Sequence, residues 1–164
     1  HRGYNKEKFI QKVDMIRGII PDVSLSTDII VGFPGETDDD FQDTMNIVKY
    51  VEFDSVYMFQ FSPRPGTKAY DMEDEFVNQD IIKKRFQHLK DVQTDISEKR
   101  LKRYVGTKQL LLIEKPSKKN NRVLTGKIDS GQITHIDKKN VSIGDIVQVK
   151  ITDSTPFYLK AELI

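Results

Sequence analysis

The stretch Ser24-Leu-Ser-Thr-Asp-Ile-Ile-Val-Gly-Phe-Pro-Gly-Glu-Thr-Asp-Asp-Asp-Phe41 decides how the first half of the chain folds. Residues 24–31 are short, β-branched and apolar toward their end, which predicts a strand covered on both faces. Gly32-Phe-Pro-Gly35 interrupts that strand, because glycine permits backbone angles closed to other residues and proline fixes one torsion. Thr37, with Asp40 three positions later, predicts a capping box at the start of a helix.

The segments on either side extend this pattern. Apolar residues recur at helical spacing in residues 5–20, 38–52 and 79–103. Residues 54–61 are the next predicted strand, and their aromatic residues Phe59 and Phe61 are predicted to lie in the core. A strand, a helix and a second strand at this spacing predict a right-handed βαβ unit with parallel strands.

Two loops are predicted to share the ligand-binding edge of that sheet. Ligands of strand–loop–helix units bind at the carboxyl ends of the strands, which is where Gly32–Glu36 and Ser62-Pro-Arg-Pro-Gly-Thr67 lie. Arg64, held between two prolines, suits an anion or carboxylate clamp. Two plainer interpretations stay open: a tight turn without a ligand, and a surface ion pair for Arg64.

The composition changes near residue 104, and no helical periodicity follows. Five short strands are predicted at residues 107–114, 122–128, 131–136, 145–152 and 158–163. Five strands in so short a segment fit a small closed or nearly closed barrel of OB-like size. Its lysines and the aromatic residues Phe157 and Tyr158 are typical of barrels that bind single-stranded or loop nucleic acid.

Charge divides the chain in the same way. Residues 1–98 have a net charge of −7 and residues 99–164 a net charge of +8, although the 164-residue total is only +1. This polarity favours a polyanionic partner for the second part, with a solvated lysine-rich surface as the alternative. No apolar run approaches the ~18 residues of a membrane span. The chain opens at His1 rather than Met, which indicates a fragment of a longer protein or a processed form.

The sequence contains no cysteine, so it offers no disulfide and no thiolate ligand for an iron–sulfur cluster. Its three histidines (His1, His88 and His135) are widely separated, and a metal site is therefore not expected.

Several motifs together resemble a known family. Thr27-Asp-Ile-Ile-Val-Gly-Phe-Pro-Gly-Glu-Thr37 and Phe61-Ser-Pro-Arg-Pro-Gly-Thr67 look like late-barrel motifs of radical-SAM methylthiotransferases. Pro116-Ser-Lys-Lys119, Leu124-Thr-Gly-Lys127 and Ile151-Thr-Asp153 with Pro156-Phe-Tyr-Leu159 resemble the TRAM module that ends those enzymes. The resemblance is strongest to the tRNA branch, which methylthiolates C2 of N6-isopentenyladenosine next to the anticodon.

This resemblance implies a fold of class α/β plus all-β. Residues 1–103 are expected to form the C-terminal part of an open TIM-like (βα) radical-SAM barrel with a connecting helix. Residues 104–164 are expected to form a five-stranded, OB-like TRAM β-barrel that binds RNA. The implied partners are the anticodon stem-loop of tRNA and the missing N-terminal part of the same chain, in the cytoplasm and without a membrane.

The resemblance also implies cofactors and site residues. The whole enzyme uses S-adenosylmethionine and two 4Fe–4S clusters; this cysteine-free fragment ligates neither cluster and is expected to be inactive alone. The implied contacts with S-adenosylmethionine are Ser26, Asp28, Gly32, Phe33, Pro34, Gly35, Glu36, Phe61, Ser62 and Arg64. The implied contacts with RNA phosphates are Lys118, Lys119, Arg122 and Lys127.

Two other functions fit the same residues. One is a relative that methylthiolates a ribosomal protein, which predicts little affinity for anticodon stem-loops. The other is a standalone RNA-binding adaptor without catalysis, in which the half barrel is only structural.

Overall fold

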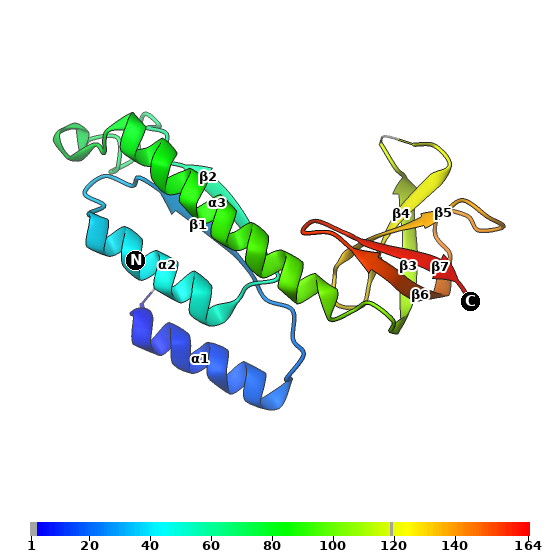
Figure 1. The fold of residues 1–164 in the computed structure, drawn as a ribbon. Coiled ribbons are helices and arrows are strands. Elements are labelled where there is room, and N and C mark those ends of the chain that lie inside the picture. Colours follow the sequence, from blue (N-terminus) through cyan, green and yellow to red (C-terminus); the bar gives the residue numbers. More distant parts are fainter. Residues whose placement is uncertain (1–2, 119) are drawn as a thin grey trace. The chain divides into compact units, whose positions relative to one another are not determined.

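The computed structural model describes residues 3–118 and 120–164 (Figure 1). The chain divides between Ile96 and Ser97 into two compact units, and each unit has its own hydrophobic core. None of the helices within the described residues is long and apolar enough to span a membrane.

The first unit contains a parallel βαβ arrangement, as the sequence predicts (Figure 1). Its elements are α1 (Lys6–Ile19), β1 (Ser26–Val31), α2 (Asp38–Val51), β2 (Ser55–Gln60), a 3₁₀ turn η1 (Glu73–Glu75) and α3 (Gln79–Lys102), which ends beyond the unit boundary. Ser26 pairs with Ser55 and Val31 with Gln60, so β1 and β2 run in register and end together.

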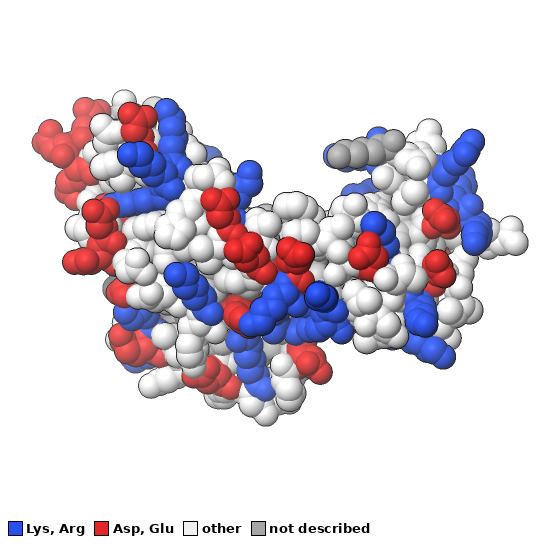
Figure 2. Space-filling model, in the orientation of Figure 1, with Lys and Arg blue, Asp and Glu red and all other residues white. Residues whose placement is uncertain are grey.

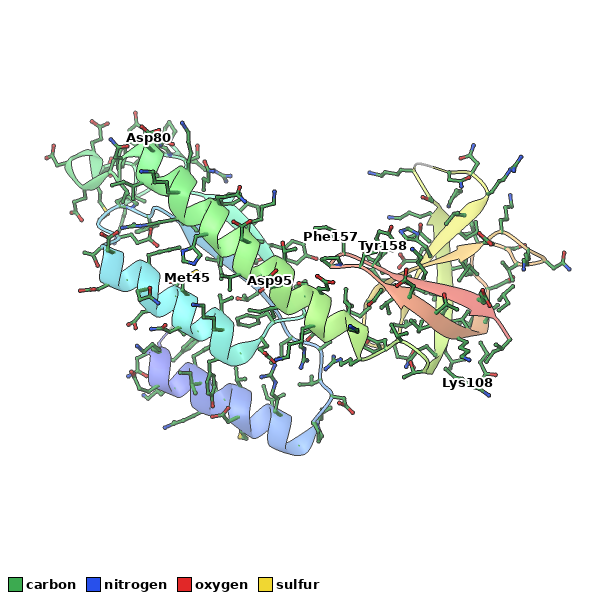
Figure 3. The ribbon with its side chains drawn as sticks, in the orientation of Figure 1. Met45, Asp80, Asp95, Lys108, Phe157 and Tyr158 are labelled. Atoms are coloured by element: carbon green, nitrogen blue, oxygen red, sulfur yellow. The ribbon has the colours of Figure 1, made fainter. Side chains whose placement is uncertain are left out.

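The two-stranded sheet is covered on one face only, and the prediction that β1 is covered on both faces was wrong. Burial alternates along β1, from the fully buried Val31 to Ile30, which is 53% exposed. Phe59 on β2 is also 53% exposed, so its predicted place in the core was wrong as well. The reason is that α1, α2 and α3 bring their apolar stripes to a single face, where Met45 is completely buried (labelled in Figure 3).

The start of α2 has the predicted capping box. The Thr37 hydroxyl accepts the Asp40 backbone N–H at 3.1 Å, and the Asp40 carboxylate accepts the Thr37 backbone N–H at 2.9 Å. Hydrogen bonds from the Thr37 side chain and then its backbone lower the pKa of Asp40 below its usual value. The cap therefore fixes where the loop after β1 ends and the helix begins.

A buried arginine on α3 joins this loop to the rest of the unit. The Arg85 guanidinium donates to the Glu36 carboxylate at 2.9 Å, to the Glu36 backbone carbonyl at 3.0 Å and to Asp38 at 2.6 Å. Its side chain is 8% exposed, and that of Glu36 is 11% exposed. Burial is the largest single effect on the pKa of Arg85, and it lowers that pKa. The hydrogen bonds to Asp38 and Glu36 together outweigh burial, so the pKa of Arg85 is raised.

The second unit is a closed five-stranded barrel, which confirms the predicted architecture (Figure 1). Its strands are β3 (Lys108–Pro116), β4 (Val123–Ile128), β5 (Ile133–Asp137), β6 (Ile146–Ser154) and β7 (Leu159–Leu163), in the spatial order β3-β4-β5-β7-β6. Leu111, Ile113, Val149, Ile151 and Leu159 have almost no exposed surface and fill the interior. Closure leaves every strand paired on both sides, with β5 and β7 parallel.

Gly126 on β4 is the point of closest approach between two strands of the barrel. A Cβ atom at this position would lie 2.0 Å from the backbone carbonyl oxygen of Leu112 on β3. The β3–β4 register shifts between Ile113 and Lys115, directly opposite this glycine. Only a residue without a side chain lets the bulged strand pass here.

We expect Gly126→Ala to lower the free energy of unfolding by about 1–3 kcal/mol or more, because the backbone must move to admit the methyl group. The matched control is Gly18→Ala, whose added Cβ has no atom within 4 Å and which lies in α1. That control should gain roughly 0.5–1 kcal/mol from helix propensity. Urea unfolding followed by circular dichroism measures both, and equal stability of the two variants would contradict the close approach.

We expect Arg85→Met to cost about 3–5 kcal/mol, because it leaves the Glu36 carboxylate buried without its cation. Adding Glu36→Gln to this variant should recover part of the loss by removing the unpaired charge. Lys83→Met is the control, since its ion pair with Asp80 is solvent-exposed and worth about 0–1 kcal/mol. An Arg85→Met variant as stable in urea as Lys83→Met would show that the cluster does not hold the loop.

Candidate nucleic-acid interface and loop edge

The two loops predicted to share one edge do so. β1 and β2 are parallel and in register, so the Gly32–Glu36 loop and the segment from Phe61 leave the same end of the sheet. The Phe61 backbone N–H donates to the Val31 carbonyl at 2.8 Å. The rings of Phe33 and Phe61 meet edge to face, with centroids 5.5 Å apart. Hence the structure brings the two predicted halves of the cofactor edge together.

The side chains at this edge differ in their exposure. Ser26 and Asp28 lie on the open face of β1, opposite Ser55 and Tyr57 of β2. The predicted site residues that are exposed at the loops are Phe33, Gly35, Ser62 and Arg64, whereas Phe61 is half-buried and Pro34 is buried. The Arg64 carbonyl accepts the Thr67 hydroxyl at 2.8 Å, which closes the turn after the second proline.

The glycines of the first loop serve internal packing. Gly32 and Gly35 have positive φ angles of 77° and 79°. A Cβ on Gly32 would lie 2.3 Å from the Ile82 side chain of α3, and one on Gly35 would lie 2.8 Å from the Glu75 carboxylate. The Gly32 backbone N–H donates to Glu36 at 2.6 Å, so the Glu36 carboxylate faces the protein and Arg85. The positive φ angles and close contacts of these two glycines are therefore explained by packing within the unit.

The predicted phosphate-binding residues occupy the second unit. Lys118 lies in the β3–β4 loop, Arg122 comes just before β4, and Lys127 is on β4; all three are exposed. Lys119 lies outside the described residues. Figure 2 shows Lys and Arg side chains spread over the visible face of the barrel unit, with few acidic ones among them.

A groove of about 710 Å³ crosses the outer surface of the barrel. A single row of cross-strand partners runs along its floor: Lys115 of β3 pairs with Thr125, Thr125 with His135, and His135 with Lys160. Cross-strand partners point to the same face of a sheet, so these four side chains form a continuous line. We call this line the groove row.

Two connections between strands form the sides of the groove. Pro116, Ser117 and Lys118 belong to one side, and Phe157 and Tyr158, labelled in Figure 3 between β6 and β7, belong to the other. The Tyr158 ring contacts the His135 ring edge to face, with ring centroids 4.6 Å apart. Phe157 is 68% exposed, so most of its ring is open to solvent beside the groove.

His135 lies at the centre of the groove row. Its Nδ1 atom lies 2.9 Å from the Thr125 hydroxyl. Burial lowers the pKa of His135, and a hydrogen bond with the Leu124 backbone acts in the opposite direction. A neutral imidazole and a hydroxyl both donate and accept hydrogen bonds, so the groove floor can bind polar edges of either kind.

The sequence interpretation missed this arrangement. His135 counted only as one of three separated histidines, and Thr125 appeared only within the motif Leu124-Thr-Gly-Lys127, with no role assigned to it. No local pattern marked His135 as outward-facing, because it is the structure that buries the polar Thr134 and the apolar Ile136 on either side of it. Within the described residues, no group of three acidic, histidine or cysteine residues could hold a metal ion.

Comparisons with known proteins agree with this geometry. Residues 102–164 match the TRAM domain family, which covers the whole barrel. Over its full length the chain is 43% identical to a tRNA-2-methylthio-N(6)-dimethylallyladenosine synthase of Clostridium botulinum. Proteins of the same name are 40% identical over 98% of this chain in Corynebacterium jeikeium and 42% identical over 99% in Fusobacterium nucleatum.

The chain covers only 32%, 36% and 37% of the relatives from Corynebacterium, Clostridium and Fusobacterium, respectively. It therefore spans about a third of the length of the curated relatives it matches. The resemblance to methylthiotransferases with a TRAM module is confirmed: the chain is similar along its length to synthases of this name, and its residues 102–164 match the TRAM domain family.

Proposed function

We propose that this chain is a part of an enzyme that methylthiolates C2 of N6-isopentenyladenosine next to the anticodon of tRNA. The observation that carries the proposal is the similarity along the entire chain to synthases of that name. The loop motif Arg64-Pro-Gly-Thr67, which suggests the tRNA branch rather than the ribosomal-protein branch, supports it. Such an activity belongs in the cytoplasm, where tRNA is modified.

In this proposal the TRAM barrel binds the anticodon stem-loop. Lys118, Lys119, Arg122 and Lys127 neutralise phosphates, which fix the position of the RNA without reading its sequence. The net charge of +8 over residues 99–164 supports this role, because it attracts a polyanion.

The first unit contributes to the binding of S-adenosylmethionine, which supplies the methyl group and the radical when bound. The open face of β1 offers the Ser26 hydroxyl and the Asp28 carboxylate to the amino and ribose groups of that cofactor. Phe33 and Arg64 lie at the same edge and fit its adenine ring and carboxylate. The residues do not fit an iron–sulfur cluster, because the chain has no cysteine. We infer that the thiolate ligands come from outside this chain, which is inactive alone.

We expect the chain to bind an end-labelled anticodon stem-loop RNA weakly and with a strong dependence on salt. If about 4–6 phosphates are neutralised, the slope of log K against log salt should be roughly −3 to −5. Fluorescence anisotropy across a salt series gives this slope. Binding that does not change with salt would contradict a basic RNA-binding surface and favour the branch that acts on a protein.

Charge variants locate the contacts. Combining Lys118→Ala, Arg122→Ala and Lys127→Ala should make the slope less negative by roughly 2–3, about 0.7–0.9 for each contact. Lys49→Ala, which removes an exposed cation from α2, should leave it unchanged. If both proteins give the same slope, the phosphates bind elsewhere.

In the full-length enzyme, we expect Arg64→Ala to reduce turnover roughly ten-fold or more, because the variant loses a hydrogen bond between charged groups. The Arg64 side chain is exposed, and Arg64 holds its turn through its backbone carbonyl, which accepts the Thr67 hydroxyl, so the variant should melt at the temperature of the parent enzyme. Lys68→Ala is the matched control, since Lys68 is an exposed cation just after the same turn. Equal kinetics of both variants would make Arg64 an ordinary surface charge.

A further inference from the structure

The barrel groove has a polarity that simple phosphate binding does not require. On the side of the β3–β4 connection lie Lys115 and Lys118, and in the described part of the chain neither lysine forms an ion pair. At the other end of the groove row, Lys160 is bound to Asp153 at 2.8 Å. The cations available to a phosphate are therefore concentrated on one side.

The opposite side presents an aromatic surface. Phe157 has 68% of its surface exposed, although its neighbours Tyr158 and Leu159 are half-buried and fully buried. The hydroxyl of Thr155 accepts the backbone N–H of Tyr158 at 3.1 Å and donates to the Tyr158 carbonyl at 3.1 Å, which fixes the turn that carries Phe157. An exposed aromatic ring on a fixed turn is suited to stacking with another flat ring.

The floor between these sides is both apolar and polar. Val123 and Ile133 line it on either side of the hydrogen-bonded pair Thr125 and His135. Asp137 also lines the groove and adds a carboxylate that accepts hydrogen bonds from amino and ring N–H groups. The volume of about 710 Å³ lies within the roughly 300–1,000 Å³ usual for ligand sites.

We propose that the barrel groove is a subsite for one nucleobase that is turned out of a single-stranded segment of RNA. The base stacks on Phe157, its polar edge faces Thr125, His135 and Asp137, and the phosphates beside it lie against Lys115 and Lys118. This inference rests on the proposed RNA binding by the barrel. It goes further, because a duplex keeps its bases stacked internally and cannot present one to Phe157.

The test compares two RNAs of equal length, a stem-loop and a fully paired duplex, in their affinity for the 164-residue chain. Phe157→Ala should bind the stem-loop roughly five- to a hundred-fold more weakly, the usual effect of losing one stacked base, and the duplex unchanged. Phe157→Tyr should retain the affinity of the parent, since it keeps the ring. Ile146→Ala is the matched control, because Ile146 is also 68% exposed on the barrel and does not line the groove.

A second measurement reports stacking directly. The chain contains no tryptophan, so Phe157→Trp introduces a single fluorophore of this kind. Its emission should be quenched by the stem-loop and not by the duplex. Replacing one particular loop nucleotide with an abasic residue should abolish the quenching and weaken binding, whereas abasic replacements elsewhere in the loop should not.

The outcomes separate this inference from the proposed function. If neither RNA binds the parent chain, RNA binding by the barrel is wrong and the subsite falls with it. If the stem-loop binds with the expected salt slope but Phe157→Ala and Ile146→Ala have equal affinities, the barrel binds RNA and the subsite is refuted. Equal losses for stem-loop and duplex would likewise refute it, because they indicate a contact with the backbone.

Discussion

The first unit depends on a charge that is buried where three segments meet. The Arg85 guanidinium links α3 to the Glu36 carboxylate and to the first turn of α2, and the same carboxylate accepts the Gly32 N–H at the end of β1. A buried arginine is stable only when its charge is matched, so the loop must adopt the conformation that supplies Glu36. Gly32 has to be glycine because Ile82, one turn before Arg85, occupies the space beside it.

This arrangement separates support from binding. The Gly32–Glu36 loop has the composition of a phosphate- or cofactor-binding loop, but Gly32 and Glu36 mainly form contacts within the unit. Polar side chains that are exposed to solvent lie on the open face of β1. The open face also exposes apolar surface. Each of Ile30, Tyr57 and Phe59 is more than half exposed. Apolar surface of this kind marks an interaction site in soluble proteins, which agrees with a chain that spans only about a third of its relatives.

In the barrel, strand closure decides which side chains become neighbours. Closing five strands removes free edges, and the register that closure imposes aligns Lys115, Thr125, His135 and Lys160 across four of them. Gly126 belongs to the same constraint, because it lets β3 shift register at the point where Lys115 comes opposite Thr125. The groove row is therefore a consequence of how the barrel closes, and its chemistry comes from residues far apart in the sequence.

The sequence by itself determined the elements and their order. Helical periodicity, the capping box of Thr37 and Asp40, and the regular spacing of turn residues in the second half are local signals, and they predict the βαβ unit and a small closed or nearly closed five-stranded barrel. The family resemblance rests on separate sequence motifs. Only the tertiary structure decided which face of β1 is covered. The apolar run Ile29-Ile30-Val31 is compatible with a strand that is covered on one face or on both. The tertiary structure also decided the partners of Arg85 and His135, since burial and cross-strand register depend on contacts between distant segments that no local pattern records.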